Sequence, residues 1–452
     1  MSVTFLNRFL VSFHFAQNAI LKIHFMFKNL TKPRRVVITG FGCVTPIGIG
    51  RRAFWEALEQ GTSGIKKIKS FDTSNSNVKI AAEINDFDWE AELNPKDRKN
   101  VPRTVPLALA AAREAVKDAG IETNKLTNTE RQNFGVVLGT GGGGLAFTEK
   151  QYVYWLTGEV KKASVYTIPS STHGGLSSEL SMVFGLHGLS HVVSTGCTSS
   201  TDAIGYAGQH IALGRQETMI AGGVDAPIAR GILEGFNLMT VLTKDFNDKP
   251  EKASRPFDKN RSGIVVGEGA WIFVLETLEG AIKRNAKIYA EISGYGSTCD
   301  AYHRVRLEEN GIEPARAMHL AMNDAGIDYQ KVDYVNLHGT STLLNDRIET
   351  QSIKNAFGDH AYKLKMSATK SQIGHPQGAS GAAGIGAALL ALNEKTIAPT
   401  INLDEPDESC DLNYTPNHAQ KADVKTALCN CIGFGSKNSA IILEKSIDVS
   451  SI

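Results

Sequence analysis

The chain has 452 residues, 42% of them hydrophobic, and its 48 basic and 47 acidic side chains leave a net charge of +1. This composition predicts a globular protein with a large core. The near-neutral charge argues against a nucleic-acid binder, which normally has a strong basic excess. The six cysteines are irregularly spaced, unlike a disulfide framework or a zinc site, so we expect free thiols in a reducing, cytoplasmic setting.

Residues 1–34 contain no acidic side chain and are rich in Phe, Leu and Ile. A helix here would place Phe5, Phe9 and Phe13 on one face, as in a targeting or membrane-surface helix. Polar residues interrupt the run of about 20 apolar residues that a bilayer span requires. We favour an extension outside the core, with Met26 as the natural first residue. No other segment is a candidate membrane span.

Apolar runs that end in glycines alternate with helical patterns along the rest of the chain, which favours an α/β fold. The first strand pattern covers residues 35–48 and the last covers 438–445. Helices are predicted at 104–119 and 314–325, and Pro314 suits the first turn of the second helix.

The two predicted helices end in the same Asp-Ala-Gly-Ile sequence, at 118–121 and 324–327. Each is followed by a strand pattern that finishes in a Gly/Thr loop. A weaker similarity relates "VVITGFGCVT" near the start to "AEISGYGSTC" at 290–299. We interpret the similarities as an internal duplication of an α/β unit, with chance similarity as the alternative.

Cys197 follows the β-branched run "HVVST" and Gly196, and precedes a helical pattern that extends to residue 213. The thiol is therefore expected at a helix N-terminus, where free backbone N–H groups favour the thiolate. Glycine permits the sharp turn that exposes a nucleophile at such a position. The alternative is a buried cysteine that acts only as a small hydrophobic residue.

Two histidines in the C-terminal half lie in loops that follow strand patterns. His338 is in "HGTST", and His375 is in a Gly/Ser/Ala-rich loop that also carries Lys370. A nucleophilic thiol needs partners that handle protons or stabilise charge, which favours a joint site. Phe434, flanked by glycines, marks a further loop whose backbone N–H can point into a site; a simple turn is the alternative.

Five motifs in this order closely resemble the β-ketoacyl-[acyl-carrier-protein] synthases, the elongating condensing enzymes of the thiolase superfamily: "GCTSS", "SRPFDKNRSGIVVGEGA", "HGTST", "TKSQIGH" and "GFGSKN". The resemblance covers about residues 35–445. It implies a thiolase-like, five-layered α-β-α-β-α fold with internal duplication. The implied N-terminal half is 35–286 and carries the cysteine, the C-terminal half is 287–445 and carries the histidine pair, and 446–452 is a tail.

The resemblance also implies roles for individual residues. Cys197 would accept the acyl chain from a carrier-protein thioester, while His338 and His375, as neutral imidazoles, would promote decarboxylation of the malonyl thioester. Lys370 would organise the site electrostatically, and Glu349 is the acid near this lysine.

Further roles concern the substrate. The backbone N–H groups of Cys197 and Phe434 would form an oxyanion hole, with Phe434 also in the gate. Thr340 and Thr342 would bind the phosphopantetheine arm. Phe236 and Gly142 would contact the substrate, and because Gly142 replaces a larger aliphatic residue we expect a roomier acyl pocket.

The sequence departs from the family pattern in two loops. Pro376 and Gln377 stand where two aliphatic residues are frequent after the catalytic histidine, and Pro376 would stiffen that loop. Ser436 and Lys437 replace the usual glycine and threonine of the gating loop, which should change how it opens.

The resemblance implies an acidic acyl carrier protein as partner and no metal or redox cofactor. Carrier docking would use local basic residues, for which the candidates are Lys66, Lys67, Lys69, Lys96, Arg98, Lys99 and Arg103. The chain should form a homodimer, or a heterodimer with a chain-length-factor homologue.

Several functions remain open at this stage. The expected reaction is decarboxylative Claisen condensation in fatty-acid elongation. The ketosynthase subunit of a type II polyketide system is the main alternative. A non-condensing structural subunit is disfavoured by the intact Cys, His, His and Lys set, and thiolase-type chemistry by Phe434 where a second cysteine is usual, although Cys431 is nearby.

Overall fold

The computed structural model describes residues 33–445. Our interpretations of residues 1–32 and of the tail 446–452 therefore lie outside the described residues. Within the described part, no helix is both long enough and apolar enough to cross a membrane.

The fold is built from two halves with the same strand order. The first half consists of β1 (Val36–Thr45), β5 (Phe134–Gly139), β6 (Ser190–Val193), β7 (Thr218–Asp225), β8 (Gly269–Thr277), α3 (Thr104–Asp118), α7 (Gly175–Phe184) and α8 (Ser199–Ala212). The second consists of β9 (Ala290–Cys299), β10 (Tyr334–Asn336), β11 (Lys365–Ser367), β14 (Thr426–Gly433), β15 (Lys437–Glu444), α11 (Ile312–Ala325), α12 (Leu343–Phe357) and α14 (Ser380–Glu394).

The strand order is β6-β5-β7-β8-β1 in one half and β11-β10-β14-β15-β9 in the other. Within each half the first three strands are parallel and the last two are antiparallel to their neighbours. The two halves join through a short antiparallel pairing of β1 with β9. This repeated topology confirms the internal duplication.

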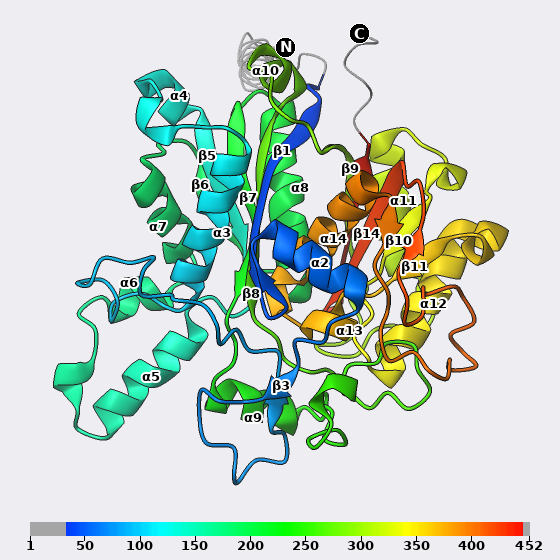
Figure 1. The fold of residues 1–452 in the computed structure, drawn as a ribbon, viewed down its shortest axis with the longest axis horizontal. Coiled ribbons are helices and arrows are strands. Elements are labelled where there is room, and N and C mark those ends of the chain that lie inside the picture. The colour runs from blue at the N-terminus through cyan, green and yellow to red at the C-terminus, as the bar shows by residue number, and fades with distance from the viewer. Residues whose placement is uncertain (1–32, 446–452) are drawn as a thin grey trace, which may run out of the picture.

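Helices and half-sheets alternate in five layers. α8 and α14 pack against each other and against both half-sheets in the centre of the molecule (Figure 1). α3 and α7 cover the outer face of the first half-sheet, and α11 with α12 lies outside the second. Strand β8 alternates accordingly, because Trp271 and Phe273 face the central core while Ile272 and Val274 face α3. The five-layered expectation is confirmed.

Paired glycines explain why the outer helices sit so closely on their strands. A Cβ atom at Gly42 of β1 would overlap the carbonyl oxygen of Ala111 in α3, and one at Gly296 of β9 would overlap that of Ala317 in α11. Glycine is therefore required where helix and strand backbones approach.

The Asp-Ala-Gly-Ile repeat has a structural role as well. Asp118 accepts a hydrogen bond from the backbone N–H of Phe41 at 3.1 Å, and Asp324 accepts one from that of Tyr295 at 3.0 Å. Both strands have a register irregularity beside these residues, which leaves the N–H group free for a side-chain acceptor.

The predicted helices differ from the observed ones by one or two residues. α3 ends at Asp118, and α11 begins at Ile312, so that Pro314 still lies in its first turn. The remaining elements are α2 (Arg51–Gln60), α4 (Asn128–Gln132), α5 (Leu145–Leu156), α6 (Thr167–Ser171), α9 (Arg230–Leu238), α10 (Leu278–Lys283), α13 (Lys370–Ile373), β2 (Gly48–Ile49), β3 (Lys66–Lys67), β4 (Ile80–Ala81), β12 (Thr396–Ile397) and β13 (Gln420–Lys421), with short 3₁₀ turns.

Candidate active site

Cys197 lies in a tight turn between β6 and α8. Gly196 adopts a φ of 71°, and a 3₁₀ turn over Gly196–Thr198 leads directly into the helix. The Ser199 hydroxyl donates to the carbonyl oxygen of Gly196 at 2.6 Å and accepts from the N–H of Thr195 at 2.9 Å. These bonds close the turn and place the thiol at the start of α8, as the sequence predicts.

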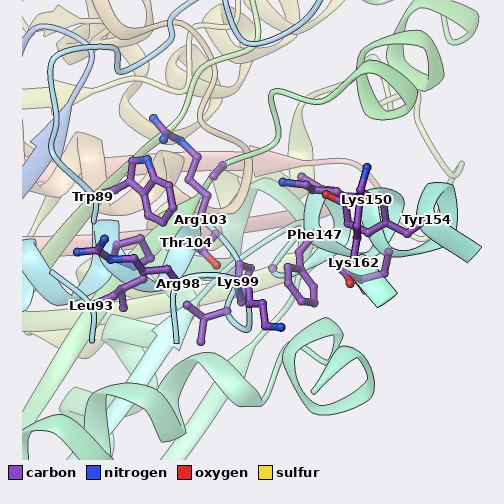
Figure 2. Close-up of a pocket in the computed structure, with 17 residues that line it drawn as sticks. Trp89, Leu93, Arg98, Lys99, Arg103, Thr104, Phe147, Lys150, Tyr154 and Lys162 are labelled. Atoms are coloured by element: carbon purple, nitrogen blue, oxygen red, sulfur yellow. The ribbon is translucent and has the colours of Figure 1, made fainter. Parts of the chain in front are cut away.

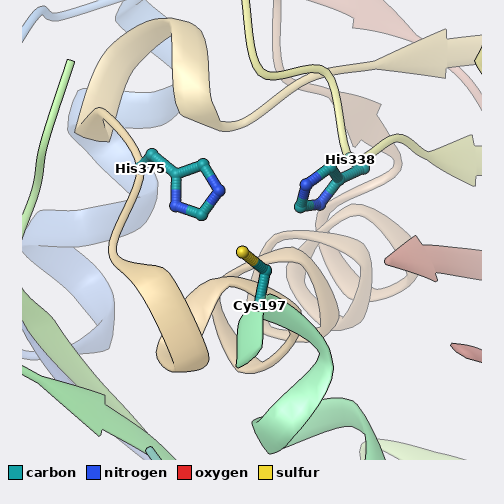
Figure 3. Close-up of side chains that lie close together, drawn as sticks. All are labelled: Cys197, His338 and His375. Carbon is teal, nitrogen blue, oxygen red and sulfur yellow. The ribbon is translucent and has the colours of Figure 1, made fainter. Parts of the chain in front are cut away.

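The two histidines lie on either side of this thiol, although both come from the second half of the chain. Cys197 Sγ and one ring nitrogen from each of His338 and His375 lie within 4.8 Å of one another. The imidazole rings are nearly perpendicular, with centroids 5.5 Å apart. Figure 3 shows both rings directed at the space above the sulfur.

Hydrogen bonds define the tautomer of His338. Lys370 Nζ donates to the backbone oxygen of His338 at 2.7 Å and lies 3.3 Å from its Nδ1. Because an ammonium group only donates, Nδ1 acts as the acceptor and the ring proton resides on Nε2. Glu349 accepts the backbone N–H groups of His338 and Gly339, both at 2.7 Å, and so holds this loop in place.

His375 has the same tautomer for a different reason. Its Nδ1 accepts the backbone N–H of Gln377 at 3.0 Å, which leaves the proton on Nε2. Gln377 adopts a φ of 48°, a left-handed conformation that is costly for a residue with a side chain. The backbone of His375 itself is held from the other side, by its N–H bond to Val265 at 2.7 Å and by the Gly267 N–H at 3.0 Å.

Burial controls the ionisation of the site. It lowers the pKa of His375 to about 3 and the pKa of His338 well below its usual value, and the nearby Lys370 adds to both effects. Both imidazoles are therefore neutral at physiological pH. Burial also lowers the pKa of Lys370 and raises the pKa of Glu349 to about 7.

The expectation of a favoured thiolate is wrong for the resting site. Burial raises the pKa of Cys197 to about 11, although the N–H of Phe434 and the charge of Lys370 act in the opposite direction. The sulfur therefore carries its proton at neutral pH, since desolvation outweighs the helix N-terminus.

The loop after β14 brings Phe434 to the sulfur. A Cβ atom at Gly433 would lie 3.1 Å from the backbone nitrogen of Cys197, and a Cβ atom at Gly196 would lie 3.2 Å from the Phe434 carbonyl oxygen. Ser436, with a φ of 62°, donates its hydroxyl to the His303 carbonyl at 2.8 Å and accepts the His303 N–H at 3.2 Å. The substituted serine therefore joins this loop to the 300–307 segment.

A cavity of about 520 Å³ leads to the three reactive side chains. Thr340, Thr342, Leu343 and Phe434 line this cavity. The hydroxyl oxygens of the two threonines are 2.9 Å apart. Other lining residues are Met239, Thr240, Val241, Ser262, Gly263, Ile264, His303, Val305, Arg306, Leu307, Leu344, Asn345, Ile432 and Gly433.

Two residues expected to contact substrate do not line this cavity. Phe236 packs behind it, in a cluster with Leu233 and Leu242. The backbone N–H of Gly142 donates to Asp225, and a Cβ atom there would lie 3.5 Å from that carboxylate. Gly142 therefore does not line the cavity around Cys197 within one chain, and the wider acyl pocket near a dimer interface stays a prediction.

The structure adds residues that the motifs did not identify. Cys431 Sγ lies 3.1 Å from the Cys197 carbonyl oxygen and 3.5 Å from His338 Nδ1, and burial raises the pKa of Cys431 to about 12. Asn430 donates to Glu349 at 2.7 Å. In the sequence, only the position of Asn430 and Cys431 just before the "GFGSKN" motif indicates that these two residues belong to the site. All six cysteines are free.

A thiol and two imidazoles are also groups that bind transition metals. Here Nδ1 of His338 and Nδ1 of His375 are already engaged, and the Lys370 cation is 3.3 Å from the first of these rings. The arrangement suits hydrogen-bond donation to a developing oxyanion better than coordination of a cation.

The duplicated, five-layered α/β fold is that of the thiolase-like proteins, and Cys197, His338 and His375 lie close together within it. Family models for the N-terminal and C-terminal domains of the β-ketoacyl synthases match residues 33–281 and 289–404. The chain therefore belongs to the β-ketoacyl synthase family.

Individual relatives extend this assignment. The chain is 43% identical, over 92% of its length and 99% of the relative, to 3-oxoacyl-[acyl-carrier-protein] synthase 2 of Coxiella burnetii. The solved ishigamide ketosynthase/chain length factor is 34% identical with a TM-score of 0.84, covering 92% of this chain and all of that one. A type II polyketide ketosynthase in complex with its acyl-carrier protein is 30% identical with a TM-score of 0.83, at the same coverage.

Proposed function

We propose that this protein elongates acyl chains by decarboxylative Claisen condensation with a malonyl-carrier protein. The observation that carries the proposal is the placement of Cys197 between two neutral imidazoles whose Nε2–H groups are free, at the base of a cavity. The relative from Coxiella burnetii is named a 3-oxoacyl-[acyl-carrier-protein] synthase, which is the product class that this reaction would form.

In the first half-reaction, Cys197 Sγ attacks the carbonyl carbon of an acyl thioester on the carrier arm. The C–S bond to the arm breaks, and the proton that Cys197 carries ends on the departing arm thiol. This exchange suits a site in which the free thiol is protonated. The N–H groups of Cys197 and Phe434 are suited to stabilise the tetrahedral oxyanion.

In the second half-reaction, the malonyl C–C bond to the carboxylate breaks and CO₂ leaves. The electron pair moves to an enolate, whose oxygen accepts hydrogen bonds from Nε2–H of His338 and His375. The resulting carbon nucleophile attacks the acyl-Cys197 carbonyl, and the sulfur leaves as a thiolate that takes up a proton from solvent. Thr340 and Thr342 line the cavity where the carrier arm would enter.

Intact-mass analysis tests the proposal. Mixing the protein with acyl-carrier thioesters of several lengths should add the acyl mass, and malonyl-carrier should then release a β-ketoacyl product. Cys197→Ala should acquire no acyl mass. A wild-type protein that is never acylated, or is acylated without condensing, would contradict the function.

A second candidate is the ketosynthase of a type II polyketide system, favoured by the likeness to the ishigamide ketosynthase/chain length factor. The same measurements separate the two. A fatty-acid enzyme condenses alone with saturated chains, whereas a polyketide subunit would require a homologous partner or unsaturated, poly-keto chains.

Carrier docking is supported by a basic pocket of about 290 Å³ beside α5 (Figure 2). Arg98, Lys99 and Arg103 line it, together with Lys150 and Lys162, and none of its lining residues is acidic. Arg103 is bound to Glu268, so Lys99 and Lys150 are the best placed to meet an acidic carrier. A solved relative is recorded with its acyl-carrier protein.

We also propose association with a second ketosynthase-like chain. The face formed by α5, α6 and α7 exposes large apolar side chains: Leu145, Tyr152, Val153, Leu156, Ile168, Met182 and Val183. β6 is an edge strand that pairs with β5 alone in the described part of the chain. An apolar face beside an open strand edge is typical of a subunit interface.

A further inference from the structure

We propose that Asp225 is a positioning residue that orients the imidazole of His375, and through it controls decarboxylation. The proposal rests on the function proposed above and names a residue outside the motifs that carry that function. Asp225 ends β7 in the first half of the molecule, whereas His375 belongs to the second.

The carboxylate of Asp225 joins two loops that are far apart in the chain. Its Oδ2 accepts the backbone N–H groups of Gly141 and Gly378, both at 2.7 Å. Its Oδ1 accepts the Gly142 N–H at 2.9 Å and the Thr140 hydroxyl at 2.8 Å. The side chain is 1% exposed, so water does not replace these donors.

The bond to Gly378 matters because of the residue before it. The backbone N–H of Gln377 donates to His375 Nδ1 at 3.0 Å and is the shorter of two contacts to this nitrogen, since the Ser380 hydroxyl lies 3.4 Å away, so it contributes most to the tautomer and the rotation of the ring. Gln377 is held at a φ of 48°, which a free loop would relax. Asp225 holds the N–H of Gly378, the residue after Gln377, and thereby maintains the strained Gln377 conformation that directs the Gln377 N–H at the His375 ring.

The rest of the loop has other anchors. The backbone of His375 is bonded to Val265 and Gly267, and α14 is held by a bond from the Ala382 N–H to Ser200 Oγ. The turn at Gln377 also keeps the bond from the Ala379 N–H to the Pro376 carbonyl at 2.9 Å, so loss of the carboxylate should leave the loop in place and loosen this turn. The close packing of Gly141 on Gly378, where a Cβ would overlap, leaves room for no other acceptor.

The two half-reactions should respond differently to substitution. In Asp225→Ala the ring loses its fixed orientation, so decarboxylation of malonyl-carrier should fall about 10- to 100-fold, the effect of a lost buried hydrogen-bond acceptor. Acylation of Cys197 does not pass through this ring, and removal of a carboxylate whose charge raises the pKa of the thiol should not slow it, so acylation should fall by less than about threefold.

Asp225→Asn should restore much of the decarboxylation. The amide oxygen can take the place of Oδ2 and keep the bonds to Gly141 and Gly378. The NH₂ group then faces the Thr140 hydroxyl, which can accept from it, while the Gly142 N–H and the Thr140 hydroxyl hydrogen lose Oδ1 as their acceptor. Thr140→Val is the matched control, because it removes one donor to the same carboxylate, and the acceptor of the Gly143 N–H, without touching the Gly378 bond; it should decarboxylate within about threefold of wild type.

The test measures acylation by intact mass and decarboxylation by release of CO₂ without primer, for each variant alone and combined with His375→Ala. In the His375→Ala background, Asp225→Ala should have no further effect on decarboxylation, because its action passes through that ring. Three results would overturn the inference: an equal loss of acylation and decarboxylation in Asp225→Ala, a further loss of decarboxylation when Asp225→Ala is added to His375→Ala, or a wild-type rate of decarboxylation in Asp225→Ala.

If the alanine variant does not fold, Asp225→Glu, which moves the carboxylate by one methylene, is measured in the same way with the same expectation. Failure of the proposed function is distinguishable, since the wild-type protein itself would then not be acylated or would not condense the acyl chain with malonyl-carrier, whereas failure of this inference appears only in the variants.

Discussion

The thiol of Cys197 lies at the start of α8, where backbone N–H groups favour a thiolate, yet its pKa is about 11. Burial against two neutral imidazoles removes the water that would solvate the charged sulfur. Reactivity in this site therefore depends on substrate binding and on the oxyanion hole, more than on a preformed thiolate.

This ionisation predicts how alkylation depends on pH. Because a thiolate is the reacting form and its fraction rises tenfold per pH unit below the pKa, inactivation by iodoacetamide should accelerate about tenfold per unit from pH 7 to pH 10. Peptide mass analysis locates the label, with exposed Cys299 as an internal reference. A rate that already levels off near pH 7 would show a preformed thiolate.

Lys370 provides a second test of the same site. Its charge lowers the pKa of Cys197, so Lys370→Met should slow alkylation at every pH below 10. The lysine also fixes the His338 tautomer, so decarboxylation should fall more than acylation does. Unchanged alkylation with intact decarboxylation would contradict both roles.

Among the secondary-structure elements, strands β1 and β9 have glycines at the positions where the outer helices pack on them. The outer helices rest on β1 and β9 at positions where a side chain would collide with a helix carbonyl. The same pair of glycines occurs in the first strand of each half. The duplication can therefore be recognised from "TGFG" and "SGYG", although the two halves share few other identical residues.

Gly42→Ala and Gly296→Ala should each destabilise the fold by about 3 kcal/mol, because the helix must move outward to admit the methyl group. Gly235→Ala is the control, since a Cβ atom there meets nothing within 4 Å and the position lies in exposed α9. Thermal unfolding measures all three. A midpoint for Gly42→Ala equal to that of the control would contradict the close-packing argument.

Across the whole molecule, a net charge of +1 gives no general attraction for an acidic partner. The basic pocket beside α5 instead concentrates positive charge on one face. Docking of the carrier should therefore be local, sensitive to salt and separable from the chemistry at Cys197.

The variant Lys99→Glu/Lys150→Glu should raise KM for the acyl-carrier substrate about tenfold with little change in kcat, and the effect should shrink at high salt. Lys363→Glu, an exposed lysine after α12, is the matched control. Steady-state kinetics at two ionic strengths check this. An equal rise of KM in both variants would rule out a specific docking face.

The apolar face over α5, α6 and α7 predicts that the chain does not remain a monomer. Native mass spectrometry should show a dimer, and Met182→Asp should weaken it because a buried carboxylate would lack a partner. Tyr362→Asp, at an exposed aromatic on the other half, should leave the dimer intact. A wild-type protein that is monomeric at micromolar concentration would instead favour a heterologous partner.

Much of the site could be predicted from the sequence. Cys197, His338, His375 and Lys370 each occur in a short glycine-flanked motif, and the structure brings all four together. Asp225 and the Gln377 N–H could not be found in this way, because they act through backbone groups that carry no sequence signal. Phe236 and Gly142, taken from resemblance alone, lie outside the cavity.

The sequence by itself determined the local features: the glycine turn before Cys197, the doubled strand-helix unit and the identity of the reactive groups. These follow from backbone preferences that act over a few residues. Only the tertiary structure decided which proton each group holds. Desolvation and hydrogen-bond partners come from segments far apart, such as Asp225 and Gly378, 153 positions from each other, and no local pattern records them.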